Sequence, residues 1–114
     1  MKNARTFGLT KIDLINATNA SVSLKTAPKS FTASGFAVGT DINKDTGKDR
    51  EVGYVVNAET GEVYGTISAT AIATIEAILD ALDADEISLP IETKVTIKQS
   101  AKGRDFLTLT VATK

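Results

Sequence analysis

Residues 50–67 read REVGYVVNAETGEVYGTI, and this stretch decides the fold. Two runs rich in valine and tyrosine flank the segment AETG at residues 58–61. Such runs on either side of a short glycine-containing turn are typical of a β-hairpin. Pairing the two strands around a four-residue turn predicts that Tyr54 lies opposite Gly65.

Alternation along this hairpin predicts which side chains face the core, because successive residues of a strand point to opposite faces. We expect the core face to carry Val52, Tyr54, Val56, Val63, Gly65 and Ile67. The outer face then carries Glu51, Gly53, Val55, Glu62, Tyr64 and Thr66. Tyr64 is therefore expected to be exposed.

The hairpin is preceded by a long predicted strand, residues 30–40. Its internal Gly35 and Gly39 indicate a bulge or a strong bend, since glycine weakens a straight strand. The two faces of this strand are expected to hold Phe36, Val38 and Thr40 on one side, and Phe31, Ala33 and Ala37 on the other.

A helix is predicted to follow the hairpin over residues 69–82, with Ser68 as its N-cap. Its apolar stripe at helical spacing consists of Ile72, Ile75, Ile78, Leu79 and Leu82, and the opposite side carries Glu76, Asp80 and Asp83. Two more strands are predicted over residues 91–100 and 105–112. In them Val95, Ile97, Leu107, Leu109 and Val111 point inward, and Lys94, Thr96, Lys98, Phe106, Thr108 and Thr110 point outward.

Three meandering strands, a helix and a two-stranded hairpin match the order of an OB-fold, a mainly β, five-stranded barrel with one helix between strands 3 and 4. A small α+β fold with an open sheet and a helix on one face is the alternative. The length of 114 residues predicts a single domain, residues 1–114, with a core over residues 28–114. Residues 1–27 are an N-terminal extension without a clear period, in which we expect a turn at residues 16–19 and a short strand at residues 21–25.

The composition excludes whole classes of site. The chain has no His and no Cys, which removes Ser-His-Asp and Cys-His catalytic sets, the usual zinc sites and disulfides. Residues 1–6 show no signal peptide, and the apolar stretch at residues 69–82 is too short and too polar to span a bilayer. We therefore expect a cytoplasmic protein that is not an enzyme and that holds no metal or cofactor.

One loop has a spacing that partly resembles a calcium loop. Residues 41–49 carry Asp and Asn at alternate positions, but Thr46 stands where glycine is required and Val52 stands where the bidentate glutamate belongs. We interpret this stretch as a solvated hairpin loop.

The formal net charge is −1, but acidic and basic residues are concentrated in different parts of the sequence. Residues 76–92 hold six acids and no base, whereas residues 94–114 hold five bases and one acid, and residues 1–40 hold five bases and one acid. This distribution predicts an acidic helix end and a basic sheet. Evenly scattered solubilising charge is the alternative interpretation.

Outward aromatic side chains accompany the basic strands. Tyr64 and Phe106 are predicted on outer faces, with Lys94 and Lys98 on a neighbouring strand. Rings that stack on bases at about 1–3 kcal/mol each, next to cations that follow the phosphates, are what sequence-independent binding of single strands requires. A register shifted by one residue would instead bury these rings.

The strand order, the charged turn at residues 100–105 (SAKGRD) and the following FLTLTV at residues 106–111 resemble the small OB-fold single-stranded DNA-binding proteins of phages that infect lactic acid bacteria. The resemblance covers residues 30–112. It implies a protein that coats and protects single-stranded DNA in phage replication or recombination, as a dimer or larger homo-oligomer. The binding residues that it implies are Tyr64, Phe106, Lys94, Lys98, Lys102 and Arg104, with Lys48 and Arg50 at the mouth of a loop.

The chain departs from this family in two respects. It has no Trp on which bases could stack, and it ends at Ala112-Thr113-Lys114 without an acidic tail. The acidic helix end, residues 80–86, is a candidate substitute for the tail in recruiting replication or recombination proteins. A small structural or assembly protein of a virion, which uses the β surface for protein contacts, is the alternative function, and a carbohydrate-binding or calcium-dependent module is a third.

Overall fold

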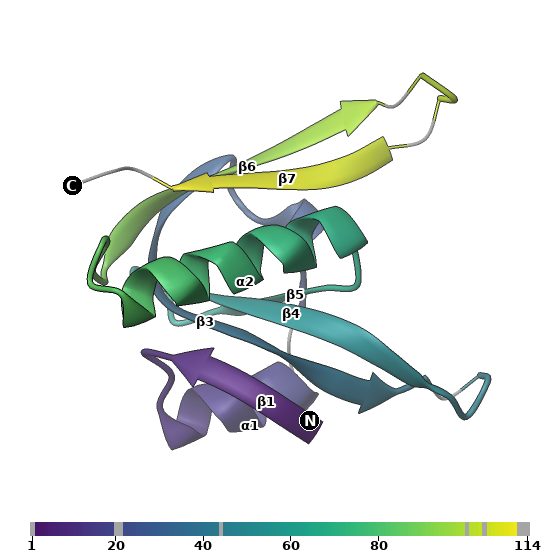
Figure 1. Ribbon diagram of the computed structural model, residues 1–114, viewed down its shortest axis with the longest axis horizontal. Helices are drawn as coiled ribbons and strands as arrows, with labels where there is room; N and C mark the ends of the chain where they lie inside the picture. Colours follow the sequence, from purple (N-terminus) through teal and green to yellow (C-terminus); the bar gives the residue numbers. More distant parts are fainter. Residues whose placement is uncertain (1, 20–21, 44, 100, 104, 112–114) are drawn as a thin grey trace.

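The computed structural model describes residues 2–19, 22–43, 45–99, 101–103 and 105–111. It is mainly β: a seven-stranded sheet curls into a half-barrel around one long helix (Figure 1). The strands are β1 (Lys2–Phe7), β2 (Val22–Ser23), β3 (Ser30–Ile42), β4 (Asp49–Asn57), β5 (Val63–Thr66), β6 (Ile91–Gln99) and β7 (Asp105–Val111). The helices are α1 (Lys11–Asn19), the 3-10 turn η1 (Leu24–Thr26) and α2 (Ala69–Asp83).

The helix α2 forms where the apolar stripe predicts it. The Ser68 side chain accepts a hydrogen bond from the Ala71 amide at 3.5 Å and caps the first turn. The whole stripe is buried against the sheet: Ile72, Ile75, Ile78, Leu79 and Leu82. Burial of each such side chain contributes about 1.5–3 kcal/mol, so this stripe is the main attachment of α2 to the sheet.

The register of the β4–β5 hairpin is as predicted, but its core face is not. Tyr54 lies opposite Gly65, and Val55 lies opposite Tyr64. Val55 and Tyr64 belong to the main core with α2, and a Cβ built on Gly53 would lie 2.8 Å from the Ile75 side chain. The face predicted to be outer therefore packs against α2, and the prediction of an exposed Tyr64 is wrong.

The other face of this hairpin is also covered. Its buried residues form a second cluster with α1 and β3: Ala17, Ala37, Val52, Tyr54, Val56 and Val63, with Leu9 packed against them. A strand buried on both faces is apolar at nearly every position, so alternation could not identify the face towards α2. Ile67, predicted in the core, lies just beyond β5 and is 63% exposed.

The bulge predicted in β3 lies between Ala33 and Gly35, where the pairing with β4 shifts. An extra residue in a strand reverses the alternation beyond it. Phe31 and Ala33 consequently join Phe36 and Val38 in the main core, instead of facing the opposite side as predicted.

The hairpin of β6 and β7 has the predicted faces. Its register runs without a break from Thr93 opposite Val111 to Gln99 opposite Asp105. Val95, Leu107 and Leu109 are buried. Ile97 is on the inward side but 50% exposed, because this hairpin extends past the first turn of α2 (Figure 1).

Residues 1–27, for which the sequence showed no clear period, contribute to the sheet and to its core. β1 pairs with β3. The turn expected at residues 16–19 is wrong, because these residues form the last turn of helix α1. The strand expected at residues 21–25 is reduced to β2 and η1, and Ser21 lies outside the described residues. Leu24 of η1 is fully buried in the main core. Arg5 of β1 forms ion pairs with Asp80 and Asp83 of α2, at 2.7 and 2.5 Å.

The predicted OB-fold is correct in part. Its five strands are present as β3 to β7, with α2 between β5 and β6, but β1 and β2 enlarge the sheet. β2 pairs in parallel with the free edge of β5, and the sheet does not close from β5 to β7. The result is a half-barrel and not a five-stranded barrel. No helix among the described residues is long and apolar enough to cross a membrane.

Candidate nucleic-acid interface

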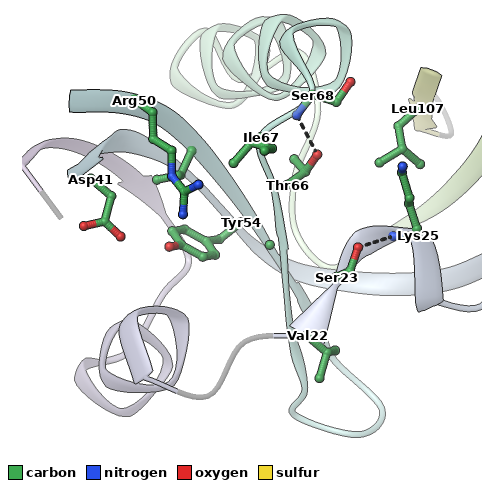
Figure 2. A pocket seen from close by; sticks show the side chains of 12 residues that line it. Val22, Ser23, Lys25, Asp41, Arg50, Tyr54, Thr66, Ile67, Ser68 and Leu107 are labelled. Atoms are coloured by element: carbon green, nitrogen blue, oxygen red, sulfur yellow. Dashed lines mark hydrogen bonds between the residues drawn. The ribbon is translucent and has the colours of Figure 1, made fainter. Parts of the chain in front are cut away.

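A cavity of about 560 Å³ opens where β4 and β5 meet the start of α2 (Figure 2). We call it the β4–β5 groove. Its lining residues are Val22, Ser23, Lys25, Asp41, Arg50, Val52, Tyr54, Gly65, Thr66, Ile67, Ser68 and Leu107. The groove thus spans the β4–β5 sheet from the end of β3 on one side to η1 and β7 on the other.

One side of the groove combines an aromatic ring with a cation. Arg50 and Tyr54 are four residues apart on β4, so their side chains lie on the same face of the strand. This is the face that points away from α2. Tyr54 is 6% exposed and forms part of the wall. Burial raises its pKa above the ordinary 10.0, with Asp41 adding to the increase and Arg50 opposing it. The phenol therefore stays protonated at neutral pH and can donate a hydrogen bond.

The opposite side of the groove is formed by η1. The Ser23 hydroxyl accepts a hydrogen bond from the Lys25 amide at 3.3 Å, and the Thr26 hydroxyl donates to the Ser23 carbonyl at 2.7 Å. These bonds fix the turn that carries Lys25, whose side chain lines the groove together with Leu107 (Figure 2). The groove therefore has a cation on each of two sides.

No carboxylate of the described residues lies within ion-pair distance of Lys25 or Arg50. Among the described residues, the ion pairs are those that Arg5 makes with Asp80 and Asp83. Asp41, the one acid that lines the groove, is the cross-strand neighbour of Arg50 but forms no ion pair with it. Lys25 and Arg50 are consequently available to an external anion such as a phosphate.

A second cationic surface lies on the outer side of the β6–β7 hairpin. Lys98 stands directly opposite the partly exposed Phe106, and Lys94 stands opposite Thr110. We call this surface the hairpin face; its residues are Lys94, Thr96, Lys98, Phe106, Thr108 and Thr110. A small cavity of about 180 Å³ lies at its base, beside Lys94 and Thr110.

The comparison with protein families decides what these surfaces serve. The model of the phi29-type phage single-stranded DNA-binding protein family matches residues 5–112. The chain belongs to this family. No curated protein and no solved structure matches it. Single-stranded DNA binding in phage replication is thus its function, in place of the structural role in a virion that the sequence left open.

The structure separates the site residues predicted for this single-stranded DNA-binding protein. Lys94, Lys98 and Phe106 lie together on the hairpin face, and Lys102 is exposed in the turn beyond it. Arg50 lines the β4–β5 groove. Lys48 is exposed in the loop before β4, and Arg104 lies outside the described residues.

Tyr64 does not have the surface that a stacking platform needs. It is 3% exposed, and its ring packs edge-to-face on Phe31 with the ring centroids 5.2 Å apart. The Asn57 side-chain amide donates a hydrogen bond to its hydroxyl at 3.1 Å. The expectation of an exposed ring is wrong because α2 covers this face of the hairpin.

Sequence reasoning missed the groove residues Tyr54 and Lys25. The sequence does contain an indication for Tyr54, because Arg50, Val52 and Tyr54 stand at alternate positions and therefore share one face of the strand. A cation on that face indicates that the face reaches solvent near Arg50. Among the described residues, no group of three or more Asp or Glu side chains is placed where it could hold a metal ion.

Proposed function

We propose that single-stranded DNA lies in the β4–β5 groove, with its phosphates near Lys25 and Arg50. Its bases lie on the apolar surface beside the buried Tyr54, because Val22 is 43% and Ile67 is 63% exposed. Cations that follow the backbone and apolar or aromatic surfaces that contact the bases suffice for binding without sequence readout.

The observation that carries this proposal is the pairing of a wall aromatic with unpaired cations in one cavity. Arg50 and Tyr54 come from the same face of β4, and Lys25 lines the same cavity from η1. A family of single-stranded DNA-binding proteins needs such a surface, and the face of the second and third strands is also where OB-folds bind oligonucleotides. Those strands correspond to β4 and β5 here.

The hairpin face is proposed to extend this track. Lys94, Lys98 and Phe106 supply cations and a ring, while Lys102 lies in the turn between β6 and β7 and Lys48 in the loop between β3 and β4. The loop between β3 and β4 and the turn between β6 and β7 extend to the same side of the molecule (Figure 1). A strand of DNA that leaves the groove would therefore meet further positive charge on this side.

The wider role that we propose is to coat and protect DNA by binding rather than by catalysis. The setting would be replication or recombination of a phage that infects lactic acid bacteria, in the host cytoplasm, with residues 1–114 acting as one domain. The exposed acids beyond α2, Asp85 and Glu86, remain candidates for contact with replication proteins, whereas Asp80 and Asp83 already pair with Arg5.

The experiment compares Arg50→Ala with Lys11→Ala, a matched loss of one exposed cation on α1. Binding to fluorescent oligo-dT is measured at two salt concentrations, with duplex DNA as the competitor. A hydrogen bond to a charged group such as phosphate is worth about 1.5–3 kcal/mol, so Arg50→Ala should weaken binding at low salt by roughly tenfold or more. Lys11→Ala should change it little.

Equal effects of the two substitutions would contradict the placement of DNA in the groove while leaving DNA binding itself intact. If the wild-type protein bound duplex DNA as tightly as oligo-dT, this result would contradict the proposed mode of binding.

A further inference from the structure

Asp41 is the one acid among the residues that line the β4–β5 groove. It stands opposite Arg50 in the pairing of β3 with β4, so its side chain shares a face of the sheet with Arg50 and Tyr54. Figure 2 shows its carboxylate near the hydroxyl end of the Tyr54 ring. A carboxylate repels phosphates, since like charges repel each other. Phosphate binding therefore does not account for an acid at this place.

The Asp41 carboxylate has one oxygen bonded within the chain and one that is available. Its Oδ1 atom accepts a hydrogen bond from the Ile42 amide at 2.9 Å, which holds the side chain at the end of β3. Among the described residues, no donor bonds its Oδ2 atom, and neither Lys25 nor Arg50 forms an ion pair with it. Asp41 is half-buried in the wall of the groove, so a donor on a bound molecule can reach this carboxylate.

The Tyr54 hydroxyl supplies a hydrogen-bond donor in the same part of the groove. Burial raises the pKa of this phenol, and the charges of Asp41 and Arg50 act on it as well, as expected for groups that lie near one another. No hydrogen bond joins the hydroxyl to a described residue, and no buried polar side-chain atom of these residues lacks a partner. The hydroxyl is therefore not sealed in the core but reaches the groove.

An acceptor such as Asp41 distinguishes the bases of DNA by their exocyclic amines. Adenine, cytosine and guanine each carry an amino group, whereas thymine has the carbonyl oxygen O4 where cytosine has its amine. A carbonyl oxygen that faces a carboxylate leaves two acceptors without a donor, which is costly in a partly desolvated groove. An amine in the same place donates to the carboxylate.

We propose that Asp41 is a specificity-determining residue that accepts a hydrogen bond from the exocyclic amine of one bound base, so that the groove disfavours thymine. The Tyr54 hydroxyl donates to a ring nitrogen or carbonyl oxygen of the same base. The backbone of the DNA stays with Lys25 and Arg50, because Asp41 repels its phosphates. The preference at this one base is added to contacts that do not depend on sequence.

This inference rests on the proposed function, because it requires DNA in the groove. The test compares oligo-dC with oligo-dU, whose bases are alike in size but carry an amine or a carbonyl at position 4. Wild-type protein should bind oligo-dC about tenfold more tightly than oligo-dU. The measured quantity is the ratio of the two dissociation constants, because a general change of charge affects both oligonucleotides alike.

Asp41→Asn keeps the shape of the side chain and removes its charge. The asparagine amide can present its oxygen to the cytosine amine or its NH₂ group to the uracil carbonyl, so the ratio should fall to about one. The matched control is Asp45→Asn in the loop between β3 and β4. Asp45 is exposed and does not line the groove, so this variant loses the same charge and should keep the wild-type ratio.

The inference is overturned if the wild-type protein binds oligo-dU as tightly as oligo-dC, or if Asp41→Asn keeps the wild-type ratio. Arg50→Ala then separates the two failures. If it still weakens binding, DNA remains placed in the groove and only the role of Asp41 is lost. If it does not, the proposed function fails as well.

Discussion

Tyr54 on β4 lies directly opposite Gly65 on β5, and both residues line the β4–β5 groove. Because Gly65 has no side chain, the groove stays open beside Tyr54. Because opposite residues of an antiparallel pair share a face, any side chain at position 65 would point into the groove. This pair therefore determines how much of the groove is open to DNA.

Gly65→Thr is expected to fill the groove and weaken binding to oligo-dT by about tenfold, through loss of roughly one base contact. Threonine favours strands where glycine weakens them, so the variant should melt at or above the wild-type temperature. Binding titrations and thermal melts measure both effects. Wild-type affinity in a folded variant would show that DNA does not enter the groove at this point.

Replacing Lys94 and Lys98 together with alanine should reduce the salt dependence of binding. Each phosphate contact on a single strand contributes about 0.7 to the slope of log K against log salt concentration, so the slope should decrease by about 1.4. Lys11→Ala provides the control for loss of positive charge outside the two surfaces. A slope equal to that of the wild-type protein would remove the hairpin face from the binding track.

Tyr64 is expected to matter for stability and not for binding. Tyr64→Ala removes a buried ring from the contact with Phe31 and should lower the free energy of unfolding by about 3–5 kcal/mol. Tyr64→Phe loses only the hydrogen bond from Asn57 and should cost about 1 kcal/mol. Denaturant unfolding measures these changes. If the folded Tyr64→Phe variant bound oligo-dT more weakly than the wild-type protein, Tyr64 would have a role in DNA binding, contrary to this prediction.

The raised pKa of Tyr54 makes a prediction about alkaline pH. Its folded-state pKa lies above the ordinary 10.0, so the unfolded phenol loses its proton first. The resulting stability is fully present below pH 10.0 and is lost as the pH rises through the folded-state pKa. Wild-type protein should thus lose stability above this pH more steeply than Tyr54→Phe. Parallel pH profiles of the two proteins would contradict a buried, protonated phenol.

The elements that could be predicted from the sequence are those set by local patterns. The register of Tyr54 with Gly65 follows from the turn length, and α2 follows from its apolar stripe and from Ser68. The regular alternation around Lys94 and Lys98 likewise predicted the faces of the β6–β7 hairpin.

What the sequence could not show depends on contacts between distant segments. β4 is apolar on both faces, so only the position of α2 reveals that Tyr64 is inside and that Tyr54 lines a groove. The β1 strand is joined to α2 through Arg5, whose partner Asp83 is 78 residues away. No local period predicts such a contact, and Lys25 enters the groove only because η1 packs beside β5.

Tyrosine fluorescence tests the central claim most directly, because the chain has two Tyr and no Trp. Tyr64→Phe leaves Tyr54 as the single tyrosine, and Tyr54→Phe leaves Tyr64. Titration with oligo-dT should quench the emission of Tyr64→Phe, whose remaining ring lines the groove, and should leave that of Tyr54→Phe nearly unchanged. Quenching of Tyr54→Phe with none in Tyr64→Phe would contradict the placement of single-stranded DNA in the β4–β5 groove.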